Sequence, residues 1–506
     1  MDYFNTHLLS LILFTPTVAA LIMLFLPNEA RLQRWFAFAA SLIPFILTLV
    51  LWGRFDPDAA GFQFEEKYIW YEALNSSFHL GVDGISFSMV LLTTLLTPLA
   101  ILASFSVTDR VKPYMMLFLF LETGMLGVFL ALDLLIFFVF WEVGLVPMYF
   151  LINQWGSANR NYASLKFMIY TMGGSLGLLL AVQMLGVLFG TYDLIALYER
   201  WNSLSADTIL MGMTIDAVKT IAFWAFAIAF AVKVPLWPFH TWLPDAHTEA
   251  PTAGSMILAG VLLKLGAYGF IRLVLPLYPV ESRTFAGALA FLAVGAIVFG
   301  AFGSFGQTDF KRLVAYSSVN HMGFVVLGIA AAGLAAGTAD AHIAMSGAVL
   351  QMFNHGLSAA GMFFLVGVIY ERTHTRSLDD FGGLFPLVPV YGGILIFTSM
   401  ASLGLPGLNG FVSEFMIVRG SYQPLTIYTA MAMLGLLFTG AYILKGIKKV
   451  LHGPMNEHWA HGEHKLTEIN TREILVMAPL MALMLFTGLW PRWILEIINK
   501  AETALF

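Results

Sequence analysis

Long apolar runs constrain this chain more than any other feature of its sequence. A run of about 18 or more apolar residues is long enough to cross the hydrocarbon core of a bilayer as a helix. We therefore predict an all-α, polytopic membrane protein of about fourteen transmembrane helices. The predicted spans lie near 8–26, 35–52, 82–105, 114–132, 134–152, 165–190, 220–238, 254–276, 285–303, 312–332, 344–369, 388–418, 425–447 and 474–495.

Composition agrees with lipid as the main solvent and narrows the possible chemistry. Hydrophobic residues make up 59% of the chain and charged residues 11%, and the net charge of -5 is small for 506 residues, so nucleic acid is not an expected partner. There is no cysteine, which excludes disulfides, cysteine-ligated iron–sulfur clusters and thiolate catalysis. No nucleotide-binding glycine motif occurs either, so we expect no cofactor in this chain.

The loops that carry most of the lysine and arginine predict the orientation. Numbered in chain order, the odd loops hold about twice as many of these residues as the even loops and the tails, and positive residues favour the cytoplasmic side. Both termini of this multi-pass chain are therefore predicted to face the periplasm, or its equivalent, across a bacterial or mitochondrial inner membrane.

Two apolar segments are interrupted in comparable ways. Proline and glycine break the seventh span at 233–238 and the twelfth at 403–410. Corresponding broken helices in two halves are typical of inverted-repeat transporters. We predict two inverted five-helix repeats at 114–276 and 285–447, preceded by helices 1–3 at 1–113. The remaining part, 448–506, is predicted to be a loop and a C-terminal helix.

Four charged residues are the main candidates for a function inside the predicted spans, namely Glu142, Lys233, Lys264 and Glu414. A charged side chain at mid-membrane costs about 2.5–3.5 kcal/mol on insertion scales, so each needs a physical reason. A proton relay is one reason, because a buried lysine gives up its proton more easily and binds it again when a carboxylate approaches. Structural ion pairs are the alternative. Two of the four charges adjoin helix breaks, which favours the relay.

Histidines extend this set of candidates. His321 and His355 lie at membrane depth among polar neighbours, and imidazole can pass a proton between its two nitrogens near neutral pH. A histidine that is bonded to a backbone carbonyl is the alternative for each. Glu122 is a weaker candidate in the fourth span. The histidine-rich loop at 452–464 has a conceivable metal-ligand spacing, but a solvated loop explains it without a metal, and we predict none.

The stretch from Lys233 to Thr252 resembles the signature of the antiporter-like subunits of respiratory NADH:quinone oxidoreductase, complex I. Segments 80–86, 308–318 and 403–407 match the same family. The resemblance implies one half-channel in each repeat, joined by a hydrated polar axis. It also implies family roles at six positions. Glu142 matches the glutamate of the fifth helix, Lys233 the lysine of the seventh helix, and Lys264 the central lysine. Glu414 matches the acid that one branch of the family carries on the twelfth helix, and His321 and His355 match two positions of the polar axis.

The function that this resemblance implies is proton translocation, coupled to electron transfer in other subunits. The chain would then be a non-redox part of the enzyme, with the L-type and N-type antiporter-like chains and lipid as its partners. A subunit of a multi-subunit sodium/proton antiporter is the nearest alternative. A membrane scaffold and a quinone-binding redox enzyme are two further classes, and the intramembrane charges and the lack of a cofactor motif speak against them.

Overall fold

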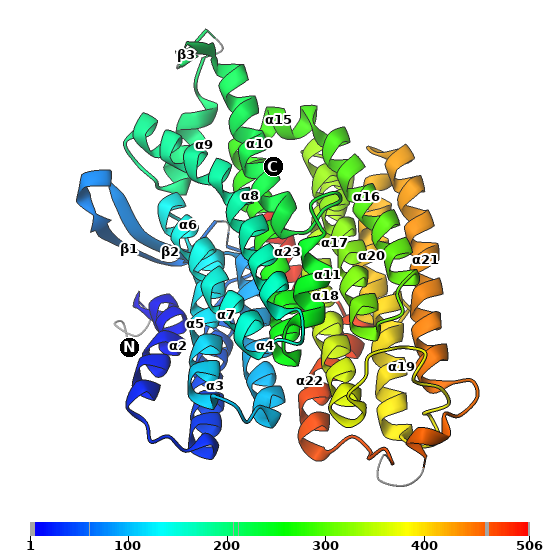
Figure 1. Ribbon diagram of the computed structural model, residues 1–506. Helices are drawn as coiled ribbons and strands as arrows, with labels where there is room; N and C mark the ends of the chain where they lie inside the picture. Colours follow the sequence, from blue (N-terminus) through cyan, green and yellow to red (C-terminus); the bar gives the residue numbers. More distant parts are fainter. Residues whose placement is uncertain (1–5, 60, 206, 211, 461–464, 504–506) are drawn as a thin grey trace.

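The computed structural model describes residues 6–59, 61–205, 207–210, 212–460 and 465–503. Within these residues the chain is a bundle of long helices that run between two ends of the molecule (Figure 1). Thirteen described helices are long and apolar enough to span a membrane. The shorter apolar helix α19 (Pro389–Leu403), followed by α20 (Asn409–Tyr422), makes a fourteenth, broken crossing. The predicted fold class is confirmed.

The crossings follow the predicted spans closely. They are α2 (Leu8–Phe25), α3 (Ala30–Trp52), α4 (Gly84–Ala103), α5 (Val111–Leu130), α6 (Leu134–Val143) with α7 (Leu145–Trp155), α8 (Arg160–Phe189), α10 (Ile215–Lys233), the segment Thr252–Leu277, α16 (Ala286–Phe305), α17 (Phe310–Leu334), α18 (Ala339–Thr373), α19 with α20, α21 (Thr426–Leu451) and α22 (Thr471–Leu489). The division into two inverted repeats and the orientation of the termini stay predictions.

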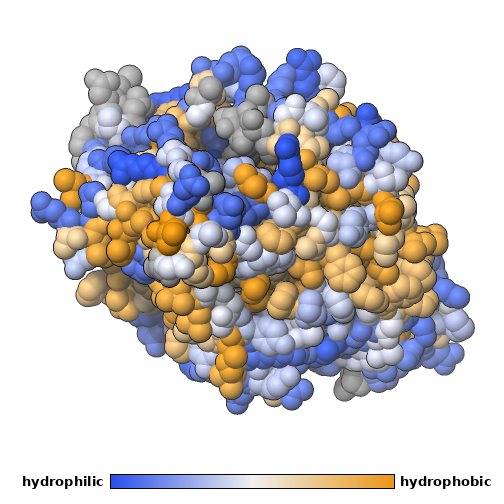
Figure 2. Space-filling model, turned by 90° about the horizontal axis from the view of Figure 1, so that it is seen from above, coloured by the Kyte–Doolittle hydropathy of each residue, from blue (hydrophilic) through white to orange (hydrophobic). Residues whose placement is uncertain are grey.

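Several elements outside the crossings were not predicted. They are the antiparallel hairpin of β1 (Gln63–Tyr71) and β2 (Ser76–Val82), a small hairpin of β3 (Ile209–Leu210) and β4 (Met213–Thr214), and the short helices α9 (Leu194–Asn202), α11 (Trp242–Glu249), α15 (Pro279–Thr284) and α23 (Arg492–Thr503). In Figure 1, β3, α9 and α15 lie at the upper end, on the side of the even loops. Figure 2 shows the molecule from this end. Hydrophilic patches alternate there with hydrophobic side chains, and the hydrophobic side chains continue over parts of the edge of the molecule.

The β1–β2 hairpin is held to its neighbours by polar contacts. The Glu66 carboxylate accepts a hydrogen bond from the Leu9 backbone N–H at 2.8 Å. Asp193, which precedes α9, lies 2.5 Å from Lys67 Nζ and 3.0 Å from His79 Nδ1. Burial raises the pKa of the Asp193 carboxyl, but the hydrogen bonds from His79 and Lys67 outweigh it and hold that pKa below its usual range.

The break in the seventh crossing follows from its prolines. Helix α10 ends at Lys233, and Pro235 supplies no N–H to continue the ladder. The carbonyls that the break leaves free find other donors: Leu236 N–H donates to Ala231 O at 2.8 Å, and Trp242 Nε1 donates to Val232 O at 2.9 Å. The chain then resumes as α11, so the break predicted at 233–238 is confirmed.

The break in the twelfth crossing rests on two glycines. Gly404 and Gly407 have φ values of +82° and +93°, which L-residues with a side chain rarely adopt. Helix α19 ends at Leu403 and α20 begins at Asn409, and a Cβ at Gly410 would collide with Ala401 O. The break predicted at 403–410 is confirmed, and it brings the start of α20 close to the end of α19.

The segment Thr252–Leu277 is a crossing of unusual helical geometry. Helix α12 (Thr252–Ile257) passes into the π-helical turn η3 (Leu258–Leu262), then α13 (Leu263–Gly269), a second π-helical turn η4 (Phe270–Val274) and α14 (Leu275–Leu277). Short π-helical turns inside helices often occur at functional sites. The 18-residue apolar stretch of this crossing and that of α18 are wholly buried, whereas only a third of the corresponding stretch is buried in each of α8, α21 and α22. The core therefore lies along these two helices.

A candidate proton path at mid-membrane

Lys264 lies at the centre of the buried core. Its side chain is fully buried, and Nζ donates to the carbonyl of Ala259, five residues earlier in the π-helical turn η3. Nζ is also hydrogen-bonded to His355 Nδ1 on α18 at 2.7 Å. The widened turn exposes a carbonyl on the same helix, which gives a lysine in this apolar setting the polar partners that it requires.

The next groups along the path are two histidines and a glutamate. The His321 ring on α17 lies 5.7 Å from the His355 ring between centroids, and His321 Nδ1 lies 2.7 Å from Glu414 Oε1 on α20. Tyr442 OH on α21 lies 3.2 Å from His321 Nε2. Both ring nitrogens of His321 therefore have a polar partner, which fixes the ring between α20 and α21.

Amide side chains hold the glutamate in place. Gln351 Nε2 donates to Glu414 Oε1 at 2.9 Å, and Ser413 Oγ donates to Gln351 Oε1 at 2.5 Å. Asn354 Nδ2 donates to the carbonyl of Asn409, the first residue of α20, at 2.7 Å. These contacts tie the start of α20 to α18, so the helix break determines the position of the Glu414 carboxylate.

Four of the six predicted site residues thus come together in one buried line: Lys264, His355, His321 and Glu414. They come from four different helices, and none of their side chains is more than about one-twentieth exposed. Close backbone contact supports the first link, because a Cβ at Gly356 of α18 would lie 2.9 Å from the carbonyl of Gly260. The geometry suits transfer of a proton along the line, since each member has an ionisable side chain and lies within a few ångströms of the next.

The other two predicted residues, Glu142 and Lys233, form a separate group. Lys233 is buried at the end of α10, with Nζ 4.9 Å from the centroid of the Trp141 ring. Glu142 is partly exposed at the surface of this chain. The two charges interact electrostatically, but no nitrogen–oxygen distance within 4 Å joins these two described side chains, so they do not form a direct ion pair.

The helices that carry Lys233 and Lys264, α10 and α13, lie close together. A Cβ at Gly266, two residues after Lys264, would lie 3.0 Å from the Cβ of Lys233 and 2.9 Å from Phe230 O. The glycine therefore lets α10 and α13 approach closely at the level of both lysines.

Two basic residues near the line were not predicted from the sequence. His247 on α11 is fully buried and stacks on Phe363, with ring centroids 4.3 Å apart and planes inclined by 11°. It interacts electrostatically with Lys264 and with Lys311, which is buried at the start of α17. His247 belongs to the motif 233–252, and its position in that motif was the signal that would have identified it.

Two other candidates stay apart from the line. Glu122 on α5 is fully buried, and neither carboxylate oxygen has a hydrogen-bond partner in the described chain. Residues 461–464 of the histidine-rich loop lie outside the described residues. Across the residues that the structure describes, no group of three or more His, Cys, Asp or Glu side chains is arranged to hold a metal ion.

Comparison with known proteins gives consistent results along the whole chain. Residues 131–439 match the model of the NADH:quinone oxidoreductase/Mrp antiporter transmembrane family. NADH-quinone oxidoreductase subunit M of Rhodobacter capsulatus is 41% identical over 506 residues, covering 99% of this chain and 96% of the relative. NADH-ubiquinone oxidoreductase chain 4 of Arabidopsis thaliana is 38% identical over 507 residues, covering 99% and 97%.

Solved structures agree with the sequence relatives. A chain of respiratory complex I from Thermus thermophilus with bound NADH matches with a TM-score of 0.84 and 27% identity, over 98% of this chain and 99% of that chain. A chain of the Mrp complex from Dietzia sp. matches with a TM-score of 0.82, over 98% of this chain and 52% of that chain. At 22% identity, this second likeness concerns the fold alone.

Proposed function

Because the chain belongs to the NADH:quinone oxidoreductase/Mrp antiporter transmembrane family, we propose that it is the M-type, proton-translocating membrane subunit of a respiratory NADH:quinone oxidoreductase, complex I. It lies in the inner membrane with both termini on the periplasmic side or its equivalent. L-type and N-type antiporter-like chains are its neighbours, and other subunits carry out the electron transfer. The absence of cysteine supports this non-redox role.

The observation that carries the proposal is the buried line Lys264, His355, His321 and Glu414. A proton bound by Lys264 passes to His355, then to His321, and leaves from Glu414. The middle step spans two rings whose centroids are 5.7 Å apart, and it requires a bridging water or a ring rotation. Each transfer moves one proton between groups that remain buried, so no charge has to enter lipid.

Electrostatics of ordinary size can drive this transfer. Two unit charges 4 Å apart attract by about 4 kcal/mol at an effective dielectric constant of about 20. Moving one charge across 100 mV costs about 2.3 kcal/mol. The electrostatic energy that changes when one ion pair in the core forms or separates is therefore larger than the energy needed to move one proton across 100 mV. Glu142 and Lys233 are the pair for the first repeat, since they already interact without direct contact.

A subunit of a sodium/proton antiporter is the alternative with the same fold. The full-length relatives described as quinone oxidoreductase subunits favour complex I, because their identity of up to 41% is well above the 22% of the Mrp structure. Co-purification decides between the two: complex I membership predicts a flavin- and iron–sulfur-containing peripheral arm with this chain, and an antiporter predicts none.

Lys264→Met tests proton translocation by this chain directly. Methionine keeps the length of the side chain and removes the titrating nitrogen. We expect NADH-driven acidification of inverted membrane vesicles, measured with a pH-gradient dye, to fall at least tenfold while the complex still assembles. Lys112→Met is the matched control, because Lys112 Nζ also donates to backbone carbonyls but lies away from the line. Normal acidification in Lys264→Met, with assembly intact, contradicts the proposal.

A further inference from the structure

The amine of Lys233 is buried without a hydrogen bond. The residue is only 2% exposed, and Nζ has no hydrogen-bond partner in the described chain. Glu142 interacts with it electrostatically but not by direct contact. A buried ammonium group that has lost water and has no partner is costly. If this pair separates and re-forms during proton transfer, the separated state needs another group that stabilises the charge on Lys233.

The face of the Trp141 ring is the group that the amine meets. Lys233 Nζ lies over this ring, 4.9 Å from its centroid. An ammonium group within about 6 Å of a ring centroid is attracted by the negative face of the ring, and tryptophan attracts it best. The attraction is stronger where water is excluded, and Trp141 is fully buried. The geometry is therefore that of a buried cation–π contact.

Three contacts hold the Trp141 ring in this orientation. Its Nε1 donates to Ser175 Oγ on α8 at 2.9 Å. The Phe137 ring stacks on it with centroids 5.9 Å apart, and the Phe230 ring of α10 meets it edge to face at 5.3 Å. The indole N–H is thus satisfied by the serine and the ring is packed between two aromatic neighbours. Its face stays turned towards Lys233 because these contacts oppose rotation of the ring.

Trp141 and Glu142 are consecutive residues of α6, so Lys233 has two alternative partners on one helix. Consecutive side chains point about 100° apart around a helix axis. The lysine side chain is a flexible four-carbon stem, and rotation about its own bonds carries the ammonium group from the ring towards the carboxylate. The exchange of partners therefore needs no displacement of α6 or α10.

We propose that Trp141 is a positioning residue that holds the protonated amine of Lys233 on its ring face while Glu142 is apart. This inference rests on the proposed function, in which the two charges separate and re-form their pair. The indole ring has no net charge and attracts a cation more weakly than a carboxylate does. Lys233 on the ring therefore remains protonated in the separated state but releases its proton more easily than from an ion pair with Glu142.

Stepwise fluorination of the indole tests this role in the assembled complex. Mono-, di- and trifluorotryptophan, introduced at position 141 by stop-codon suppression, withdraw electrons from the ring face and nearly keep the shape of the ring. We expect NADH-driven acidification of inverted vesicles to fall with each added fluorine, and about fivefold for the trifluoro ring. Fluorine makes the indole N–H a stronger donor, so a weaker bond to Ser175 does not explain such a loss.

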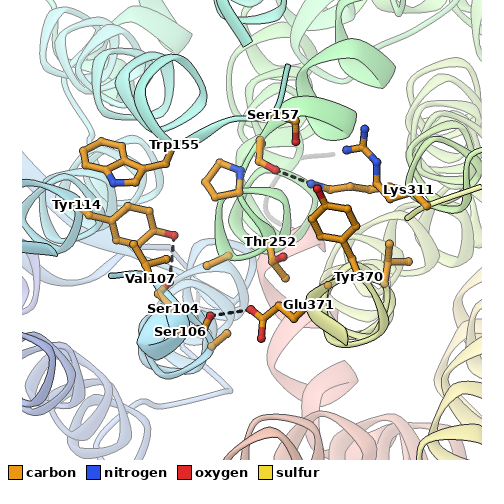
Figure 3. A pocket seen from close by; sticks show the side chains of 17 residues that line it. Ser104, Ser106, Val107, Tyr114, Trp155, Ser157, Thr252, Lys311, Tyr370 and Glu371 are labelled. Atoms are coloured by element: carbon orange, nitrogen blue, oxygen red, sulfur yellow. Dashed lines mark hydrogen bonds between the residues drawn. The ribbon is translucent and has the colours of Figure 1, made fainter. Parts of the chain in front are cut away.

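Trp155 is the matched control, because a cation also lies over its ring. The Arg110 guanidinium carbon is 5.0 Å from the centroid of the Trp155 ring, and half of the Arg110 side chain is exposed. Trp155 lies at the wall of a polar cavity at the end of the bundle that carries the odd loops, next to Tyr114 (Figure 3). Its indole N–H donates to the carbonyl of Asp109 at 2.9 Å. The same fluorinated residues at position 155 should leave acidification unchanged.

Two ordinary substitutions separate the attraction of the ring face from packing. Trp141→Phe keeps an aromatic face, whereas Trp141→Leu has none, and both lose the hydrogen bond to Ser175. With assembly intact on native gels, we expect the phenylalanine variant to keep clearly more acidification than the leucine variant. Equal loss in these two variants overturns the role of the ring face. Normal acidification with trifluorotryptophan at position 141 overturns it as well.

The result with Lys264→Met separates this inference from the proposed function. If Lys264→Met stops acidification and trifluorotryptophan at position 141 does not lower it, the chain translocates protons and the role of Trp141 is wrong. If Lys264→Met acidifies normally, the proposed function itself is wrong, whatever the fluorinated residues give.

Discussion

The Glu414 carboxylate is the group whose replacement tests the path most sharply. Its Oε1 accepts from His321 and Gln351, at 2.7 and 2.9 Å. In Glu414→Gln the amide oxygen accepts both bonds, so neither donor loses its partner. A hydrogen bond to a charged group contributes about 1.5–3 kcal/mol and a neutral one about 0.5–1.5 kcal/mol. The exchange of both bonds therefore costs about 2 kcal/mol, less than the 3–5 kcal/mol typical of removing one partner of a buried ion pair.

A loss of this size leaves the complex assembled, but the proton loses its last carrier. An amide does not bind a proton in the physiological range, so no group beyond His321 accepts it. If the loss of the Glu414 carboxylate raises the activation free energy of proton transfer by the cost of one charge crossing 100 mV, about 2.3 kcal/mol, the rate of proton translocation falls about fiftyfold. We expect acidification near the detection limit in Glu414→Gln and partial activity in Glu414→Lys, which still titrates.

Acidification of inverted vesicles, with native gel electrophoresis for assembly, measures both effects. Glu473→Gln is the matched control, because Glu473 is also a buried glutamate, bonded to Arg372 at 2.7 Å, but lies outside the path. Normal pumping in Glu414→Gln refutes the exit role. Equal loss in the glutamine and lysine variants, with assembly intact, shows that the carboxylate geometry matters and not only a titrating group.

Three further predictions concern other parts of the chain. Glu142→Gln keeps the shape but removes the charge that interacts with Lys233, so acidification should fall while assembly, checked on native gels, is unchanged; normal pumping makes the pair structural. Gly266→Val places a Cβ 2.9 Å from Phe230 O and should lower stability by about 1–3 kcal/mol in thermal unfolding, whereas Gly173→Val, with open space around it, should not. The folded-state pKa of Asp193 is depressed, so the stability that this carboxylate adds to the hairpin is present above its ordinary pKa of about 3.9 and is lost as the pH falls towards the folded-state pKa. Asp193→Asn should therefore make limited proteolysis of the hairpin fast at neutral pH, and unchanged cleavage contradicts this.

The crossings were predictable because one physical requirement determines them. Each must be a helix of about twenty apolar residues. The prolines and glycines near Lys233 and Leu403 interrupt the backbone hydrogen bonds of the helix, however the rest of the chain packs. The hairpin β1–β2 was missed for the opposite reason. Segment 63–71 is short, only one of its residues is buried, and its charged and aromatic residues are also common in loops.

The candidate site was predictable in its members but not in its connections. Charge at membrane depth identified Lys264 and Glu414, because a buried charge is costly unless it has a function or a partner. Sequence does not show that His355 joins Lys264 while Lys233 stays separate, since those contacts depend on packing between distant helices. Gln351 and Lys311 were missed because a glutamine in a helix and a lysine after a loop are common at ordinary surfaces.

The glycine contact between Gly260 and Gly356 limits where the path can be switched. Two backbones that approach each other this closely slide or separate only with loss of close packing, so we expect the Thr252–Leu277 crossing and α18 to move as one rigid body. Lys264 and His355 ride on this body, each within four residues of a touching glycine. The spacing between them is therefore fixed mechanically, and a gate that opens and closes during turnover has to lie at another joint, such as the gap between the two histidine rings.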